Sequence, residues 1–255
     1  MSIFSSCAQQ DEYPMREVEL YQNRISVNCH GPWILLYEAG LPFTVIDVDL
    51  LQGEQSEPDF IAMNPCHSVP TFKDADGTTM WEGNAIMRHI CRKYPSAAKY
   101  YPVDPHVDLA LDWRLNTFYK HVGDISYARL GIIDDEIPTT NQLKEMVQDD
   151  MNVLTDFFLQ KGRKPFIGGY SPCIADFAIA PTFKFLRITD VRIPRAVEEY
   201  LDRFYNAVPY AREIAAGKFE GGEGSVDDHG IDALISERAP LYGKVVMDPT
   251  RDGAR

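Results

Sequence analysis

A helix followed by a strand is encoded by Ser26-Val-Asn-Cys-His-Gly-Pro-Trp-Ile-Leu-Leu-Tyr-Glu-Ala-Gly-Leu-Pro-Phe-Thr-Val-Ile-Asp-Val-Asp-Leu50. Apolar side chains recur at helical spacing and predict a helix over residues 28–39. Gly40 stands just past its end, where a helix commonly stops. The run over residues 43–50, rich in β-branched residues, predicts a strand.

Elements of the same kind flank this stretch on both sides. We expect an opening strand over 18–21, a short helix over 58–63, two hairpin strands over 70–74 and 78–82, and a helix over 83–93. The order β-α-β-α-β-β-α makes the first two strands parallel through a helical crossover and the last two antiparallel. The pattern predicts a small mixed sheet with helices on its faces.

Beyond the proline-rich break at 94–105 the strand pattern stops and long helical patterns follow. We predict helices over 106–130, 140–160, 174–187 and 194–206. The expected organisation is an irregular extension at 1–16, an α/β domain at 17–95, an all-helical domain at 105–216 and a Gly-rich acidic tail at 217–255.

Composition narrows the class of protein. The 255 residues are 45% apolar and 25% charged, which is typical of a compact folded chain. The net charge of −13, without a basic cluster, argues against nucleic acid and anionic membranes as partners. No apolar run reaches membrane-span length and no secretory leader is visible, so we expect a cytoplasmic protein. Five cysteines without paired spacing predict neither disulfides nor zinc.

Three motifs together resemble those of the cytosolic glutathione transferases, closest to the serine-type theta and delta classes. They are the stretch 26–43, the stretch Asn64-Pro-Cys-His-Ser-Val-Pro-Thr71, and Trp81-Glu-Gly-Asn-Ala-Ile86. Ser26 stands fourteen residues before Gly40, which is the family's spacing from catalytic serine to helix-ending glycine. The resemblance spans residues 17 to about 216 and implies a thioredoxin-like α/β domain followed by an all-α domain.

Ser26 is the catalytic residue that the resemblance implies. A hydroxyl just ahead of a helix N-terminus lies beside unpaired N–H groups and a partial positive charge, which suits it to stabilising the thiolate of glutathione. Cys29 is the rival, because Ser26-x-x-Cys29 is similar to a redox motif that has lost its first sulfur. Apolar packing in the first helical turn is the alternative role for Cys29.

The second motif supplies further candidate glutathione contacts. Val69 precedes Pro70, and the family's proline is cis there, so the resemblance implies that the Val69 backbone pairs with the cysteinyl part of glutathione. It also implies contacts from Ser68 and, toward the glycine carboxylate, from His67 and Gln55. A surface-loop histidine is the plain alternative for His67, and Gln55 replaces the histidine common in this slot.

The third motif departs from the family. Glu82, Gly83 and Asn84 occupy the Glu-Ser-x slot that holds the γ-glutamyl carboxylate at a helix N-terminus, and the serine is glycine here. The helix N–H groups remain while a hydroxyl is lost, so we expect Gly83→Ser to tighten glutathione binding. Asn84 is a candidate to compensate.

A pocket for the electrophile is predicted on the first long helix of the second domain. Asn116, Tyr119 and Tyr127 fall on one helical face at offsets 0, 3 and 11. By family analogy this face lines the electrophile pocket, and an ordinary packing face is the alternative. Further on, Cys173 replaces the family's Ser/Thr helix cap before Asp176, which predicts a weakened cap.

The resemblance implies a detoxifying enzyme, a glutathione transferase in which glutathione thiolate attacks a small hydrophobic electrophile. Glutathione is then a co-substrate, no metal is involved, and the protein is a homodimer. Two alternatives stay open: a glutathione-transferase-like module without catalysis, and a glutathione-dependent isomerase. Thiol transfer is disfavoured because residue 26 is not a cysteine.

Overall fold

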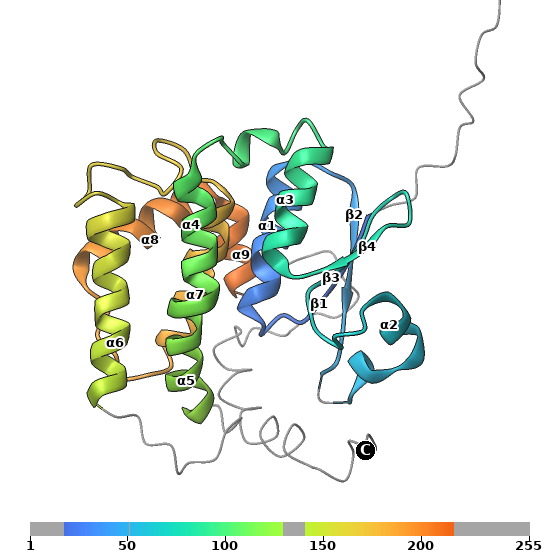
Figure 1. The fold of residues 1–255 in the computed structure, drawn as a ribbon, viewed down its shortest axis with the longest axis horizontal. Helices are drawn as coiled ribbons and strands as arrows, with labels where there is room; N and C mark the ends of the chain where they lie inside the picture. Colours follow the sequence, from blue (N-terminus) through green and yellow to red (C-terminus); the bar gives the residue numbers. More distant parts are fainter. Residues whose placement is uncertain (1–17, 51, 130–140, 217–255) are drawn as a thin grey trace, which may run out of the picture.

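A four-stranded mixed sheet and a helical half make up this computed structural model, which describes residues 18–50, 52–129 and 141–216 (Figure 1). The sheet order is β2-β1-β3-β4, with β1 and β2 parallel and the other pairs antiparallel, as the motif order predicts. The strands are β1 (Val18–Gln22), β2 (Phe43–Asp47), β3 (Thr71–Lys73) and β4 (Thr79–Trp81). The predicted extension at 1–16 and tail at 217–255 lie outside the described residues.

The two faces of the sheet carry different helices. Figure 1 shows α1 (Val27–Glu38) and α3 (Gly83–Lys93) on one face and α2 (Pro58–Met63) on the other. Tyr21 of β1 packs edge-on against Phe60 of α2, with ring centroids 6.1 Å apart. Because side chains alternate along a strand, its neighbour Leu20 points to the opposite face, where it is fully buried beside Phe72.

The described helical half contains two long helical rods and a buried central helix. The first rod is α4 (Pro105–Trp113), a π-helical turn η3 (Arg114–Phe118) and α5 (Tyr119–Arg129). The second is α6 (Asn141–Asn152) with the π-helical turn η4 (Val153–Phe158). The other helices are α7 (Ile174–Leu186), α8 (Arg195–Ala207), α9 (Pro209–Ala216) and the short 3-10 turns η1 (Glu54–Ser56) and η2 (Ala98–Tyr100).

Three details differ from the sequence prediction. The strand expected to reach residue 50 stops at Asp47, because its partner β1 ends at Gln22 in the register. The two long helices each contain a π turn, which has no pattern signature of its own. A further helix, α9, follows Val208 and was not predicted, because Pro209 suggests the end of a helical segment. The proline is instead the first residue of α9, and a helix tolerates proline in its first turn.

Helices α1 and α7 pack against each other and join the two halves. Nine of the twelve residues of α1 are buried, and all thirteen of α7 are. A helix that is buried on nearly every side must lie between two layers, and α1 lies between the sheet and α7. Its first turn is therefore held at the junction of the two halves.

Asp176 anchors the start of α7. Its carboxylate accepts hydrogen bonds from the backbone N–H groups of Cys173 (2.9 Å) and Ile167 (3.0 Å) and from the Tyr200 hydroxyl (3.0 Å). Burial raises the pKa of Asp176, although these donors counteract the effect. The Cys173 side chain in turn accepts the backbone N–H of Asp176, so the two residues form a reciprocal capping box despite the cysteine, and the Tyr200 contact joins α7 to α8.

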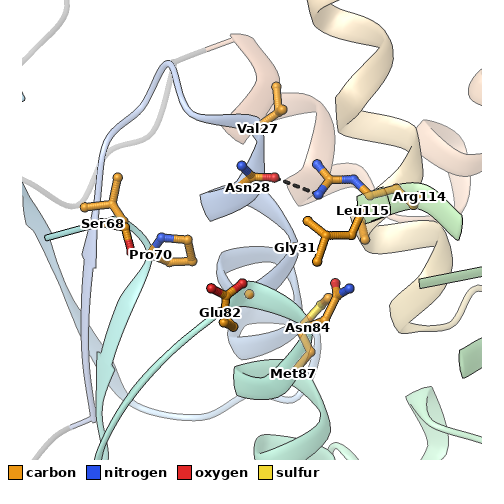
Figure 2. A pocket seen from close by; sticks show the side chains of 13 residues that line it. Val27, Asn28, Gly31, Ser68, Pro70, Glu82, Asn84, Met87, Arg114 and Leu115 are labelled. Atoms are coloured by element: carbon orange, nitrogen blue, oxygen red, sulfur yellow. Dashed lines mark hydrogen bonds between the residues drawn. The ribbon is translucent and has the colours of Figure 1, made fainter. Parts of the chain in front are cut away.

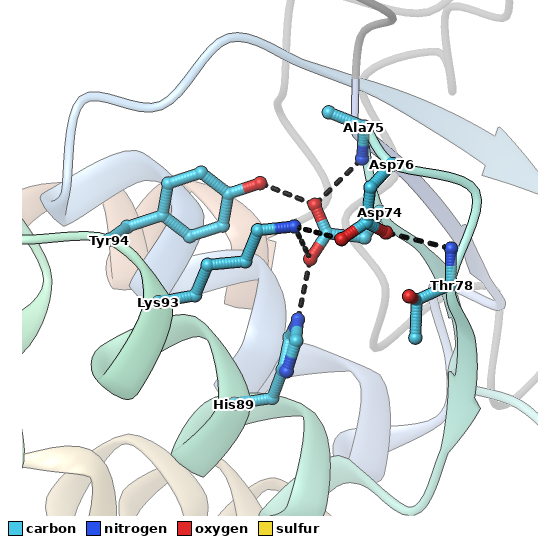
Figure 3. Close-up of polar contacts among 7 residues, drawn as sticks. All are labelled: Asp74, Ala75, Asp76, Thr78, His89, Lys93 and Tyr94. Atoms are coloured by element: carbon cyan, nitrogen blue, oxygen red, sulfur yellow. Dashed lines mark hydrogen bonds and ion pairs between the residues drawn. The ribbon is translucent and has the colours of Figure 1, made fainter.

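A second buried carboxylate, Asp74, closes the hairpin between β3 and β4 onto α3 (Figure 3). It accepts hydrogen bonds from the Tyr94 hydroxyl, from His89 Nε2 and from the Ala75 N–H, and it forms an ion pair with Lys93 at 2.9 Å. Burial by itself raises the pKa of Asp74, but the hydrogen bonds outweigh burial and hold that pKa below its ordinary value of 3.8.

We expect Asp74→Asn to destabilise the fold by about 1–3 kcal/mol, because the new amide N–H would face the Lys93 and His89 donors. Asp76→Asn is the matched control: Asp76 also pairs with Lys93, at 2.6 Å, but its side chain is exposed, so its loss should matter much less. Urea unfolding of both variants measures the difference.

The stability due to Asp74 should depend on pH in a defined direction. A carboxyl whose folded-state pKa is lowered stabilises the fold above its unfolded pKa, and this contribution is lost as pH falls through the folded value. The gap between wild type and Asp74→Asn should be constant from about pH 5 to 8 and shrink below about pH 4. A gap that widens in acid would contradict this account.

Candidate active site

A cavity of about 170 Å³ lies where the first turns of α1 and α3 meet the helical half (Figure 2). Figure 2 shows Asn28 and Arg114 close together, with Glu82 and Pro70 across the cavity from Arg114. The lining residues are Val27, Asn28, Gly31, Ser68, Val69, Pro70, Glu82, Gly83, Asn84, Met87, Arg114, Leu115 and Ala178.

Five of the seven predicted glutathione contacts line this cavity together, namely Ser68, Val69, Glu82, Gly83 and Asn84. The Val69–Pro70 peptide bond is cis, as the resemblance implies. Gln55, in η1, and His67, in the loop after α2, do not line it. The structure thus brings the middle and γ-glutamyl contacts together and leaves the two glycine-end contacts outside.

Ser26 is the N-cap residue of α1 but does not line the cavity itself, whereas its neighbours Val27 and Asn28 do. Its hydroxyl lies near the Cys29 sulfur and acts to lower the pKa of that thiol, but burial has the larger effect. Burial raises the pKa of Cys29 to about 12, so this thiol stays protonated at neutral pH. Cys29 is therefore a packed residue and not a redox nucleophile.

Glu82 is held in a backbone conformation that few residues adopt. Its φ is 69° at the N-cap of α3, in the left-handed region, and its side chain lines the cavity. Positive φ at a residue other than glycine has a cost and concentrates at functional sites. The N–H groups of the first turn of α3 follow it, so a carboxylate acceptor and backbone donors lie side by side.

Gly83 is required by close approach of the two helices. A Cβ at this position would lie 2.9 Å from the backbone oxygen of Asn28. That oxygen has no donor four residues on, because Pro32 lacks an N–H. A serine at 83 would require α1 and α3 to shift apart, a cost that the expectation of tighter glutathione binding did not include.

Asn84 joins α3 to the helical half. Its Nδ2 donates to the backbone oxygen of Leu111 in α4, at 3.1 Å. One N–H of the amide is thereby engaged in holding the two halves together. This position of Asn84 also fixes the N-terminus of α3 beside the helical wall of the cavity.

Two polar residues that line the cavity, Asn28 and Arg114, were not among the predicted site residues. Arg114 Nη1 donates to Asn28 Oδ1 at 2.6 Å, although 86 positions separate the two residues. The sequence did contain a signal for Arg114. It follows Val107 and Leu111 at helical spacing and precedes Phe118, so a charged residue falls on the buried stripe of that helix.

A second cavity, of about 350 Å³, lies along α5. The three predicted electrophile-pocket residues, Asn116, Tyr119 and Tyr127, all line it, and the two tyrosine hydroxyls are hydrogen-bonded at 2.6 Å. Leu115 lines both cavities, so the two adjoin.

Within 18–50, 52–129 and 141–216, no three His, Cys, Asp or Glu side chains are grouped so that they could hold a metal ion. In the same ranges no helix has the length and apolar character needed to cross a membrane.

The fold and the cavity define a class: a thioredoxin-like sheet with an appended helical domain and a site at their junction. Residues 16–92 match the family model of the glutathione S-transferase N-terminal domain. Mouse glutathione S-transferase theta-3 is 34% identical over 101 residues, which are 38% of this chain and 42% of that protein. Glutathione S-transferase D6 of Drosophila melanogaster is 24% identical over 192 residues, 74% of this chain and 85% of that protein.

Solved structures share the fold over most of the chain. A delta-class glutathione transferase of Nilaparvata lugens superposes with a TM-score of 0.70 at 22% identity, covering 90% of this chain and 98% of that one. A diazinon-metabolizing glutathione S-transferase of the silkworm Bombyx mori superposes with a TM-score of 0.68 at 23% identity, covering 78% of this chain and 95% of that one. Residues 16–92 thus belong to the glutathione S-transferase N-terminal domain family, and the chain has the fold of the cytosolic glutathione transferases.

The contact between Gly83 and the Asn28 carbonyl predicts that Gly83→Ser lowers stability by about 1–3 kcal/mol, the usual cost of overpacking, and does not strengthen glutathione binding. Gly123→Ala is the control, because a Cβ there meets its nearest atoms at an ordinary 3.6 Å. Thermal unfolding and calorimetric titration with glutathione measure both effects. If Gly83→Ser bound glutathione more tightly and unfolded at the same temperature as the wild type, the contact between α1 and α3 would not limit this position, and the account would be contradicted.

Proposed function

We propose that the protein is a glutathione transferase, and that the cavity between α1, α3 and the helical half binds glutathione. The observation that carries this proposal is the joint lining of one cavity by Val69, Glu82 and Gly83. Glutathione would pair its cysteinyl backbone with Val69 and its γ-glutamyl amine with Glu82. Its γ-glutamyl carboxylate would accept N–H groups at the N-terminus of α3.

The reaction requires the thiol of glutathione to ionise. A cysteine-like thiol has a pKa of about 8.5, and lowering it by about 2 units requires about 2.7 kcal/mol of preference for the thiolate. A helix N-terminus contributes roughly 0.3–1 kcal/mol and a hydrogen bond to a charge roughly 1.5–3 kcal/mol. The first turn of α1 and a hydroxyl donor are together sufficient.

Ser26 is the proposed hydroxyl donor. The Ser26 hydroxyl lies near the Cys29 sulfur, and because a hydroxyl rotates about its C–O bond, it would turn its hydrogen toward the glutathione sulfur when glutathione binds. The thiolate then attacks the electrophilic carbon of the second substrate, and the leaving group departs with the electron pair of the broken bond. Cys29, which is fully buried, does not react in this scheme.

The second substrate is proposed to be a small hydrophobic electrophile bound along α5. The adjoining cavity lined by Asn116, Tyr119 and Tyr127 supports this placement. By likeness to the family we also propose that the protein works as a homodimer in the cytoplasm. Sedimentation equilibrium of the purified chain tests the dimer.

A second candidate function is a glutathione-binding module without catalysis. The placement of Ser26 outside the cavity lining, together with that of Gln55 and His67, favours it. Retention on immobilised glutathione combined with turnover of a chlorodinitrobenzene-type substrate separates the two functions. A catalytic transferase does both, whereas a module is retained and does not turn over.

Ser26→Ala is expected to raise the pKa of bound glutathione towards its solution value and to cut turnover at neutral pH by about 10-fold or more, with little loss of glutathione affinity. The hydroxyl favours the ionised thiol and contributes little to binding the rest of glutathione. Ser96→Ala, an exposed serine after α3, is the control. An unchanged thiol titration in Ser26→Ala would remove Ser26 from the mechanism.

A further inference from the structure

Arg114 is buried at the junction of the two halves. It begins the π turn η3 with 3% of its surface exposed. Its Nε donates to Thr182 Oγ1 of α7 at 3.0 Å, its Nη1 donates to Asn28 Oδ1 of α1 at 2.6 Å, and its guanidinium carbon lies 4.5 Å from the ring centroid of Tyr119 in α5. Three elements therefore hold one guanidinium in a fixed place.

None of these partners carries a negative charge. The remaining nitrogen, Nη2, is buried without a hydrogen-bond partner among the described residues. Burial lowers the pKa of Arg114 to about 10, which leaves the group charged at neutral pH. An unpaired buried cation is costly, because the charge has lost its hydration and gained no counter-ion. A site retains such a charge where an anion forms or binds nearby.

The other titratable groups around Arg114 do not neutralise it. His30 of α1 is buried, and burial lowers its pKa to about 3, so it is uncharged at neutral pH. Lys184 of α7 is a second cation, whose Nζ donates to the backbone oxygen of Ala215. The phenol groups of Tyr119 and Tyr127 also lie near Arg114. Among the described residues that line the cavity, Glu82 is the one carboxylate, and it lies across the cavity on α3.

Asn28 connects this charge to the cavity. It belongs to the first turn of α1, and its side chain lines the cavity (Figure 2). Because its Oδ1 accepts from Arg114, the amide is fixed with its donor nitrogen Nδ2 directed away from the guanidinium. Without that bond the amide oxygen and nitrogen could exchange places. Arg114 therefore decides which end of the amide a bound group meets.

We propose that Arg114 and Asn28 form a cation–amide pair that stabilises the thiolate of bound glutathione, with Asn28 Nδ2 donating to the sulfur and Arg114 as the positioning residue that orients it. The pair rests on the proposed function, since glutathione must be the bound thiol. The thiolate is the counter-ion that the buried guanidinium lacks. The positive charge acts through a water-poor interior, where it is weakly screened.

The first test is Asn28→Asp, because this substitution should change stability and catalysis in opposite directions. A carboxylate at 28 would pair with Arg114 and lie at a helix N-terminus, so melting temperature should rise. The same pair cancels the positive charge, so the pKa of bound glutathione should rise by about one unit or more, which reduces the thiolate fraction at pH 7 from about three quarters to about one quarter or less. Asn152→Asp, the same change at an exposed position of α6, should do neither.

The second test separates charge from packing at position 114. Arg114→Met keeps much of the volume and removes the charge, and should raise the pKa of bound glutathione and lower kcat with a smaller effect on the KM for glutathione. Arg114→Lys keeps the charge and should restore part of the loss. Thiolate ultraviolet absorbance against pH, with glutathione bound, is the readout for every variant.

The possible outcomes separate a failure of the Arg114–Asn28 proposal from a failure of the proposed glutathione transferase function. If Ser26→Ala raises the pKa of bound glutathione while Asn28→Asp and Arg114→Met leave it unchanged, the pair is wrong and the transferase stands. If Arg114→Met only lowers melting temperature, Arg114 is a structural residue and the proposal is overturned. If the wild type binds no glutathione, the proposed function fails and the pair fails with it.

Discussion

Burial of α1 on both sides, by the sheet and by α7, is the constraint on which the rest of the structure depends. It fixes the first turn of α1 at the junction, where Pro32 leaves the Asn28 carbonyl without a helical donor. That carbonyl in turn lies so close to α3 that residue 83 has no room for a Cβ. The cavity is the space left where these two helix N-termini and the helical half meet, closed on one side by Ser68, Val69 and Pro70 of the loop before β3.

Charge at this junction is arranged unevenly. Carboxylates that stabilise the fold, Asp74 and Asp176, are enclosed by hydrogen-bond donors at a distance from the cavity lining. The guanidinium of Arg114 has no such counter-ion among the described residues, and the first turn of α1 adds partial positive charge beside it. A site of this kind favours the ionised form of a bound thiol. The proposed chemistry therefore uses an electrostatic imbalance that the fold maintains at a cost in stability.

Sequence patterns predicted the sheet, its topology and most helices, because β-branched runs, helical periodicity and Gly–Pro breaks are local properties. The resemblance to the glutathione transferases led to the prediction that Val69, Glu82 and Gly83 share one site, and all three line one cavity. The sequence patterns did not predict the contact between Arg114 and Asn28 or the closeness of Gly83 to α1, because both depend on how residues distant in sequence pack. The π turns were missed for a related reason: a π turn changes the register of a helix without changing the residue types in it. Gln55 and His67 were predicted only from their positions in the family's motifs, and neither residue lines the cavity.

The central claim is that this cavity binds glutathione as a thiolate. The most direct measurement is the ultraviolet titration of glutathione bound to the unmodified protein, with free glutathione as the reference. The account predicts saturable binding and a bound-thiol pKa about 2 units below the solution value, so that thiolate is the major form at neutral pH. Saturable binding with an unshifted thiol titration would contradict the electrostatic account, and absence of binding would contradict the assignment of the cavity itself.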